Sequence, residues 1–224
     1  WQAVIAAVRQ HFAGDLAWLG NFLAMTSAGG SGTACIASLQ NNPDNAAQKT
    51  VTALAQGVFA VEPGSGMQEL VARKGDVIAG VGKLGAFSGV ARGSAGDHAF
   101  INLLAVSTAA PVVSTANDQV LVAEIGGVLH VVAQESTTDV SGGSALVPTR
   151  FGSFYVTDAG AVIYQAWVTG AGVTTTNDGV LCRWTETDGN ELLAREGTAA
   201  PGTGSNYGAF QALSVSPGGA IVLQ

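Results

Sequence analysis

The amino-acid sequence contains few charged residues and no basic cluster. Of its 224 residues 11% are charged, and 9 basic against 16 acidic residues give a formal net charge of −7. Nucleic-acid binding relies on clustered lysine and arginine side chains that contact phosphates, and such clusters are missing. Glycines, charges and polar residues also interrupt every apolar run before the roughly 20 residues that a membrane-spanning helix needs. We therefore expect no nucleic-acid partner and no membrane span in this segment.

Cysteine and methionine are scarce as well. The sequence has two of each, against 31 glycines, and 47% of its residues are hydrophobic. Glycine-containing turns between segments rich in valine and threonine favour strands over long helices. Because charges are few, serine, threonine, asparagine and glutamine must provide most of the polar surface. This composition predicts an all-β fold and is typical of a secreted or cell-surface protein, which we expect to be bacterial.

Three short segments of similar sequence recur at a constant interval. They are residues 69–76 (ELVARKGD), 130–136 (HVVAQES) and 191–197 (ELLAREG). The first apolar residues of these segments, Leu70, Val131 and Leu192, are 61 residues apart (131 − 70 and 192 − 131). A constant period of this length indicates tandem supersecondary units.

Each repeated segment ends a predicted β-hairpin. The clearest hairpin joins residues 120–125 to residues 128–133 through two glycines, which two-residue turns favour. Every hairpin is followed by a connection, an aromatic residue, a glycine turn and another apolar strand. The aromatic residues are Phe87, Phe151 and Phe210, and the turn glycines are Gly96, Gly160 and Gly219. Tandem four-stranded units of about 60 residues predict a β-propeller-like fold, with a β-solenoid stack as the alternative.

We interpret residues 1–224 as a single β-repeat domain. Its approximate repeats are residues 1–86, 87–150, 151–209 and a partial unit at 210–224. The first repeat is the longest, and we expect residues around 28–50 to project from the body and to hold any functional variation. Residues 1–25 match both a short N-terminal amphipathic helix and a pair of strands around a turn. We favour the strands because the later repeats have no helical alternative.

The last repeat contains only two predicted strands. Propellers typically close with four or more blades, so three complete units and a partial one do not close a ring by themselves. Three alternatives are open: the segment belongs to a longer chain, its last strands complete the first unit, or they pair with a neighbouring molecule. Unpaired strand edges are templates for pairing with other chains. We therefore expect incompleteness or self-association, or association with other surface proteins, through strand edges.

The repeats resemble a known family. Residues 177–180 (NDGV), 192–197 (LLAREG) and 200–202 (APG) are similar to bacterial extracellular tandem-repeat proteins with NxxGxxG-type repeats, and the similarity spans most of the chain from about residue 58 onward. Thr157, Ser216 and Gly93 stand where that family usually has asparagine, and residues 134–136 lack both its arginine and its glycine. The family has no defined catalytic motif. The resemblance implies a secreted or surface-anchored β-repeat protein.

No group of residues with a defined catalytic chemistry stands out. The histidines His11, His98 and His130 have no second histidine, cysteine or carboxylate at metal-ligand spacing on one element, so we expect surface or sheet-face residues. Neither a nucleophile elbow nor a phosphate-binding loop is present.

Aspartates recur near the predicted turns, at Asp118, Asp158, Asp178 and Asp188. Repeated aspartate turns can bind Ca²⁺, but the dense D-x-D-x-D-G loop is absent, so turn chemistry is the preferred interpretation. We expect no cofactor, and Ca²⁺ is the one metal that we consider.

Two further sets of side chains are candidates for a role. Trp18, Trp167 and Trp184 are candidates for a ligand-stacking platform that would hold a glycan, with packing on strand faces as the alternative. Cys35 and Cys182 are disulfide candidates in an oxidising compartment, although they lie in the first and third repeats. Two buried free thiols are an equal alternative.

These observations lead to a non-enzymatic protein as the main hypothesis. Low charge, degenerate repeats and an open-ended register indicate an extracellular structural or self-assembling component of a cell surface, appendage or matrix. The alternative is a propeller-like binding module that recognises glycan or protein through its loops. A third hypothesis, a hydrolase on a propeller scaffold, needs convergent acids or a metal site, and a fold alone does not support it.

Overall fold

The computed structural model describes residues 18–27, 32–40, 56–61 and 68–224, and within these ranges the chain is all-β, without a helix. The fifteen strands form four antiparallel sheets. Residues 1–17 lie outside the described ranges, so the short N-terminal helix is tested only over residues 18–25, which belong to a strand. In the described part of the chain no helix is long and apolar enough to cross a membrane.

Strands that follow one another in sequence also pair with one another. The first sheet contains β1 (Trp18–Ser27), β2 (Thr33–Gln40), β3 (Gln56–Val61) and β4 (Gln68–Arg73). The second contains β5 (Val77–Ile78), β6 (Gly82–Arg92), β7 (His98–Leu104), β8 (Gln119–Ile125) and β9 (Val128–Gln134). The third contains β10 (Val147–Val156), β11 (Val162–Thr169), β12 (Gly179–Thr185) and β13 (Gly189–Arg195). The fourth contains β14 (Leu213–Val215) and β15 (Ile221–Leu223).

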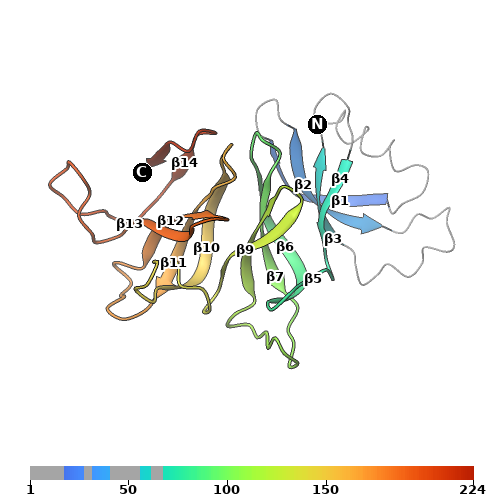
Figure 1. Cartoon of the computed structure of the whole chain (residues 1–224), viewed down its shortest axis with the longest axis horizontal. Coiled ribbons are helices and arrows are strands. Elements are labelled where there is room, and N and C mark those ends of the chain that lie inside the picture. The colour runs from blue at the N-terminus through green and yellow to red at the C-terminus, as the bar shows by residue number, and fades with distance from the viewer. Residues whose placement is uncertain (1–17, 28–31, 41–55, 62–67) are drawn as a thin grey trace.

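The sheets stand side by side, with the second sheet between the first and the third (Figure 1). Each of the first three is built around a four-stranded meander, as a propeller blade is. The predicted fold class, tandem four-stranded units of propeller-like type, is therefore confirmed. Within residues 28–50, β2 pairs with both β1 and β3 and is part of the sheet, while residues 28–31 and 41–55 lie outside the described ranges.

The central strands are mostly apolar because both of their faces are buried. On β7, Phe100 and Leu104 point into the core between the first and second sheets, whereas Ala99 and Ile101 point into the core between the second and third. Side chains alternate between the two faces of a strand, so a strand packed between two sheets has apolar residues at most of its positions. Burial of each large side chain contributes roughly 1.5–3 kcal/mol, which stabilises the packing of neighbouring sheets.

The predicted glycine turns connect the first two strands of successive meanders. Gly96, Gly160 and Gly219 have φ of +103°, +71° and +86°, values that disfavour any side chain. The same pair of backbone hydrogen bonds closes all three turns. These bonds are Gly93 N to Asp97 O (2.9 Å), Gly96 N to Gly93 O (3.2 Å), Thr157 N to Ala161 O (2.9 Å), Gly160 N to Thr157 O (3.0 Å), Ser216 N to Ala220 O (2.8 Å) and Gly219 N to Ser216 O (2.9 Å). The three turns are structural copies.

The last two strands form a sheet of their own on the third sheet. Leu213 of β14 is buried in a core with Ile163 and Leu181, and the Tyr155 hydroxyl donates a hydrogen bond to the Leu213 carbonyl oxygen at 2.7 Å. Because β14 and β15 pair with each other and pack on the third sheet, they do not complete the first sheet, which was one of the three alternatives.

Candidate functional site

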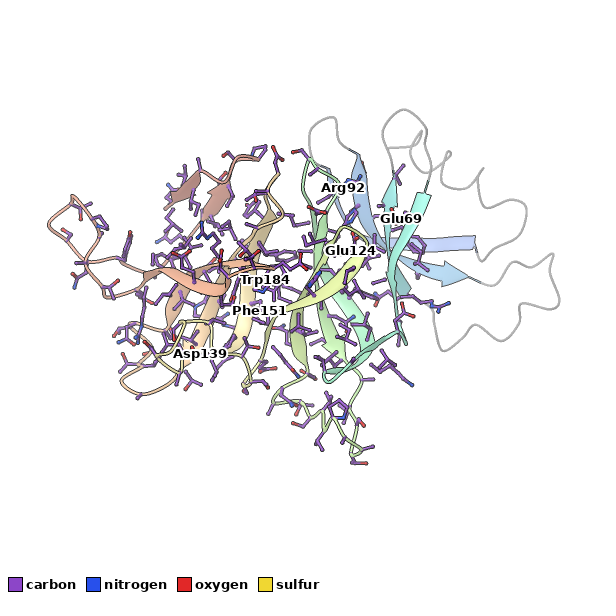
Figure 2. The ribbon with its side chains drawn as sticks, in the orientation of Figure 1. Glu69, Arg92, Glu124, Asp139, Phe151 and Trp184 are labelled. Atoms are coloured by element: carbon purple, nitrogen blue, oxygen red, sulfur yellow. The ribbon has the colours of Figure 1, made fainter. Side chains whose placement is uncertain are left out.

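Three charged or titratable side chains form a buried row across the second sheet, near one end of its strands. Arg92 ends β6, His98 begins β7 and Glu124 lies near the end of β8. In the strand register Arg92 is opposite His98, and His98 is opposite Glu124. Only 5% of Arg92 and 2% of His98 is exposed, and 13% of the Glu124 side chain. We call this the Arg92–His98–Glu124 row; Figure 2 labels its two outer members.

Hydrogen bonds fix the proton positions in the row. Arg92 Nη1 lies 2.8 Å from His98 Nε2, and His98 Nδ1 lies 2.7 Å from Glu124 Oε2. A guanidinium only donates, so Nε2 must be the accepting nitrogen and Nδ1 carries the proton. The ring is therefore neutral, and it donates to an ionised carboxylate whose other oxygen accepts from Gly127 N at 2.5 Å.

The surroundings keep Glu124 ionised. Burial raises the pKa of the Glu124 carboxyl, but its interactions with His98, the Gly127 hydrogen bond and the Arg92 charge together outweigh this effect, so the pKa lies below its usual value. The row thus contains one fixed positive charge, one negative charge and a neutral ring between them.

The row faces the first sheet, because His98 shares its strand face with Phe100, which packs in the core between the two sheets. Gly32, just before β2, makes room for the Arg92 guanidinium. A Cβ at Gly32 would lie 3.2 Å from Arg92 Cζ and would clash with the Val61 carbonyl oxygen. Glycine is also suited to the backbone at this position, where φ is +106°.

A general base needs a ring nitrogen that is free to take a proton from a substrate, and in this row Nε2 is already bonded to a cation and is buried. The arrangement holds three strands and an adjacent sheet in register. His98 is a sheet-face histidine, as expected, but not a surface one, and its two partners were not predicted. His130 is 20% exposed and its Nε2 lies 3.8 Å from Glu186 Oε1, while His11 lies outside the described residues.

The repeated ELLAREG segment performs a structural task. Arg195 Nε donates to the Asn177 carbonyl oxygen at 2.8 Å, and Gln134 Nε2, at the equivalent place one repeat earlier, donates to the Asn117 carbonyl oxygen at 2.8 Å. An arginine and a glutamine thus make the same contact from the last strand of a four-stranded meander to the loop before its third strand. This explains why the repeated segments can have either arginine or glutamine at this position.

The two loops that receive these contacts are copies as well. Asn117 Oδ1 accepts from Ser114 N and Asn177 Oδ1 accepts from Thr174 N, both at 2.7 Å. Asparagine side chains that accept a hydrogen bond from a nearby backbone N–H stabilise turns of this kind. The next residues in each loop, Asp118 and Asp178, are the first and third of the four turn aspartates considered for Ca²⁺.

The other two aspartates also lie in turns. Asp188 Oδ2 accepts a hydrogen bond from Thr185 Oγ1 at 3.1 Å, and the Asp158 backbone N–H donates to Pro217 O at 2.9 Å. Among the residues that the structure describes, no three histidine, cysteine, aspartate or glutamate side chains gather in a group that could hold a metal ion.

Glutamine side chains connect neighbouring sheets, a role that sequence reasoning missed. Gln56 Oε1 accepts from Phe87 N at 2.8 Å, and Gln119 Oε1 accepts from Phe151 N at 2.9 Å. In each case the first residue in the third strand of one four-stranded meander bonds to the aromatic position in the first strand of the next meander. The available signal was the repeated spacing of 31 or 32 residues between glutamine and phenylalanine.

The three tryptophans do not share one exposed surface in the described part of the structure. Trp184 is 6% exposed and lies in the core between the second and third sheets (Figure 2). The Trp167 ring is stacked under Arg150, with Arg150 Cζ 3.5 Å from the ring centroid. Trp18 lies at the start of β1, and its side chain is outside the described part.

Both cysteines are free and buried, in different sheets. Cys35 belongs to β2 of the first sheet and Cys182 to β12 of the third, and the second sheet lies between them (Figure 1). The candidate disulfide does not form, because the strand order places these positions two sheets apart. Burial raises the pKa of the Cys35 thiol to about 11 and that of the Cys182 thiol to about 12.

The fold and the contacts that its sheets share define the class of protein: an all-β protein whose sheets are compatible with a β-propeller. A family model described as "Family of unknown function (DUF7453)" matches residues 8–224, and the chain belongs to this family. No curated protein matches the chain.

Proposed function

We propose that the protein is a non-enzymatic extracellular structural component that assembles with copies of itself or with other surface proteins through its β-sheets. The resemblance to bacterial tandem-repeat proteins with NxxGxxG-type repeats supports this assignment, as does the low content of lysine, arginine and cysteine.

The contacts of the repeated residues support a scaffold role. Arg195 and Gln134 of the repeated segments, the asparagines of the preceding loops, and Gln56 and Gln119 all bond to the backbone. Their contacts hold loops and neighbouring sheets in place. Recurring polar side chains that hydrogen-bond to the backbone make each unit rigid. Rigid units of this kind are suited to a scaffold to which further units can be added.

The single observation that carries the assembly proposal is the exposure of Val222 on β15. Val222 is three residues after a turn glycine, as are Ala99 and Ile163 in the second and third sheets. Those two residues are 0% and 2% exposed because the next sheet covers them, whereas Val222 is 66% exposed. Val222 thus occupies a position that is covered by the next sheet in the second and third sheets but is exposed in the fourth.

Association measurements test this proposal. In analytical ultracentrifugation, wild-type protein is expected to form oligomers that grow with concentration, and Val222→Asp is expected to weaken them at least about tenfold, because a buried charge costs more than 1.4 kcal/mol. Val77→Asp is the matched control, since Val77 is 70% exposed on the short strand β5 of another sheet. Monomers at all concentrations, or equal effects of both substitutions, would contradict the proposal.

A second candidate function, a binding module, rests on the loop between β7 and β8. This loop projects from the body (Figure 1), carries no charged residue between Ala105 and Asn117, and exposes Val106 to 65% and Val112 to 62%. Two backbone hydrogen bonds of 2.9 Å between Ser107 and Val113 hold it in a hairpin. Exposed apolar surface of this kind is frequent where proteins bind partners.

Replacing residues 105–113 by the shorter counterpart at residues 169–173 of the third sheet tests the binding module. A glycan array and cross-linking to isolated bacterial surface proteins would be compared for the two forms. Loss of a specific signal with the short loop, at unchanged thermal stability, would support a binding role. An unchanged signal would exclude this loop as the binding element.

A further inference from the structure

The last strands of the first three sheets differ in the charge that they carry along their open edge. Among the described strands, β4, β9 and β13 each end a sheet and pair with one neighbour only. Each of β4 and β13 contains one glutamate and one arginine: Glu69, Arg73, Glu191 and Arg195. The sequence of β9 is VLHVVAQ, without any of the four charged residue types. Charged side chains protect an edge strand from pairing with other chains, so β9 is the edge that lacks this protection.

The difference is greatest at the first residue of the repeated segment. This residue is Glu69 in β4, His130 in β9 and Glu191 in β13, and in all three sheets it pairs next to the same bulge. The glutamates are exposed, with 52% of the Glu191 side chain accessible. A carboxylate at this place would repel a second copy of a chain whose net charge is −7. The histidine of β9 removes that charge from the middle of the edge.

The backbone of β9 presents free hydrogen-bonding groups beside His130. The turn between β8 and β9 has two residues, so the pair that closes it, Ile125 and Val128, is hydrogen-bonded. Bonded and non-bonded pairs alternate along an antiparallel ladder. The backbone groups of Val128 and His130 therefore bond to β8, and those of Leu129 and Val131 point to the open edge. Val128 is also 55% exposed.

The open stretch ends at Val132. This residue is the extra one in a bulge, since Val131 and Ala133 pair with consecutive residues of β8. The Val132 carbonyl oxygen accepts a hydrogen bond from Asn190 Nδ2 of the third sheet at 2.8 Å, so it has a partner already. A docking strand thus has the four residues 128–131 to pair with. An edge of this length supports a weak, reversible contact.

We propose that the edge of β9 pairs antiparallel with β9 of a second copy around a twofold axis. This inference rests on the proposed self-association and adds a contact to it. Leu129 of each copy exchanges two backbone hydrogen bonds with Val131 of the other, and His130 lies opposite His130 of the second copy. The same stretch serves both partners, so the contact is isologous and closes as a dimer. The second sheets of the two copies become one continuous sheet.

Disulfide cross-linking tests this register on the full chain. In the proposed pairing the Cα atoms at position 130 are about 4.5 Å apart, which a disulfide can bridge. His130→Cys should therefore give a cross-linked dimer under mild oxidation. Val128→Cys is the matched control, because Val128 is more exposed but lies four residues, or about 13 Å, from its counterpart. No dimer from His130→Cys, or equal cross-linking of both variants, would overturn the proposal.

Analytical ultracentrifugation separates this contact from the one at Val222. In the Val222→Asp protein a monomer–dimer equilibrium should remain. Adding His130→Glu places two carboxylates opposite each other and should raise the dissociation constant about fivefold or more, whereas His130→Gln should leave it unchanged. Glutamate is the residue of β4 and β13 at this place, so the fold should accept it.

The outcomes distinguish this inference from the proposed function. Oligomers that Val222→Asp reduces to monomers, with no dimer left, would preserve the proposed assembly and overturn the pairing of β9. A dimer that His130→Glu and His130→Gln affect equally would also overturn it. A dimer weakened by His130→Glu alone would support the pairing even if Val222→Asp changed nothing.

Discussion

Gln119 in the second sheet accepts a hydrogen bond from the backbone N–H of Phe151 in the third sheet, at 2.9 Å. Phe151 is 9% exposed and lies in the core that the two sheets share (Figure 2). The side chain thus supplies the partner that a buried N–H in the first strand of the next sheet requires. Gln56 repeats the relationship between the first and second sheets.

Removing this partner should destabilise the fold. Gln119→Ala leaves the Phe151 N–H unsatisfied and should lower the free energy of unfolding by about 1–3 kcal/mol. Urea denaturation monitored by tryptophan fluorescence measures the change. Gln211→Ala is the control, because Gln211 is exposed and bonds to Gln224 through its backbone. Equal stability of Gln119→Ala and wild type would show that water replaces the side chain.

The exchange between arginine and glutamine in the repeats leads to a second prediction. Arg195→Gln should cost less than Arg195→Ala, because Gln134 makes the same contact to the equivalent loop. We expect a loss of about 1.5–3 kcal/mol for the alanine variant, in which the loop loses a hydrogen bond from a charged donor, and about half of that for glutamine. Thermal denaturation ranks the two variants, and the reverse order would contradict the equivalence.

Asp139 closes the connection between β9 and β10, and its contribution should depend on pH. It accepts from Ser141 Oγ at 2.5 Å, Ser141 N at 2.9 Å and Gly143 N at 2.9 Å. The Ser141 hydroxyl bond is the largest influence that lowers the pKa of Asp139; burial opposes it, and the backbone bonds of Ser141, Ala145 and Gly143 add to the lowering.

A carboxyl whose pKa is lowered by folding stabilises the folded state above its unfolded pKa of about 4, and this stabilisation is lost as pH falls through the folded pKa. Asp139→Asn should therefore cost about 1 kcal/mol at neutral pH, since the loop is largely solvated. The difference from wild type should shrink in the acid range, below the unfolded pKa. Chemical denaturation at several pH values measures it, and a pH-independent difference would rule out the ionised carboxylate as the cause.

The two thiols should be unreactive in the folded protein. Burial raises their pKa values to about 11 and about 12, so the reactive thiolate is scarce at neutral pH and the sulfur atoms are inaccessible. Ellman's reagent should label neither cysteine in native protein at pH 8 and both in guanidinium without a reductant. A disulfide would instead leave both unlabelled in guanidinium.

Local chemistry made much of the architecture predictable. Gly96, Gly160 and Gly219 were recognised as turns because glycine is favoured where φ is positive, and the turn is closed by bonds between residues only a few positions apart. The hairpin turn at Gly126 and Gly127 was predictable for the same reason. The all-β class could be read from the apolar strands between such turns.

The contacts between repeats could not be predicted in this way. Glu124 is 26 residues from His98 in sequence and meets it only because β7 and β8 pair in a particular register. A strand shifted by one residue would turn these side chains to the opposite face. Cys35 and Cys182 were an open question for the same reason, since only the order of the sheets in space places them apart.

The sequence by itself determined the four-stranded repeat, its turns and its low charge, because hydrophobic alternation and backbone conformational preference act between neighbouring residues. Tertiary structure alone decided which polar side chains are buried together and what they do. It turned His98 into the centre of a charged row, Arg195 into a support for the loop at Asn177, and left Val222 exposed where its counterparts are covered. Such roles depend on strand register and sheet packing, which bring together residues that are distant in sequence.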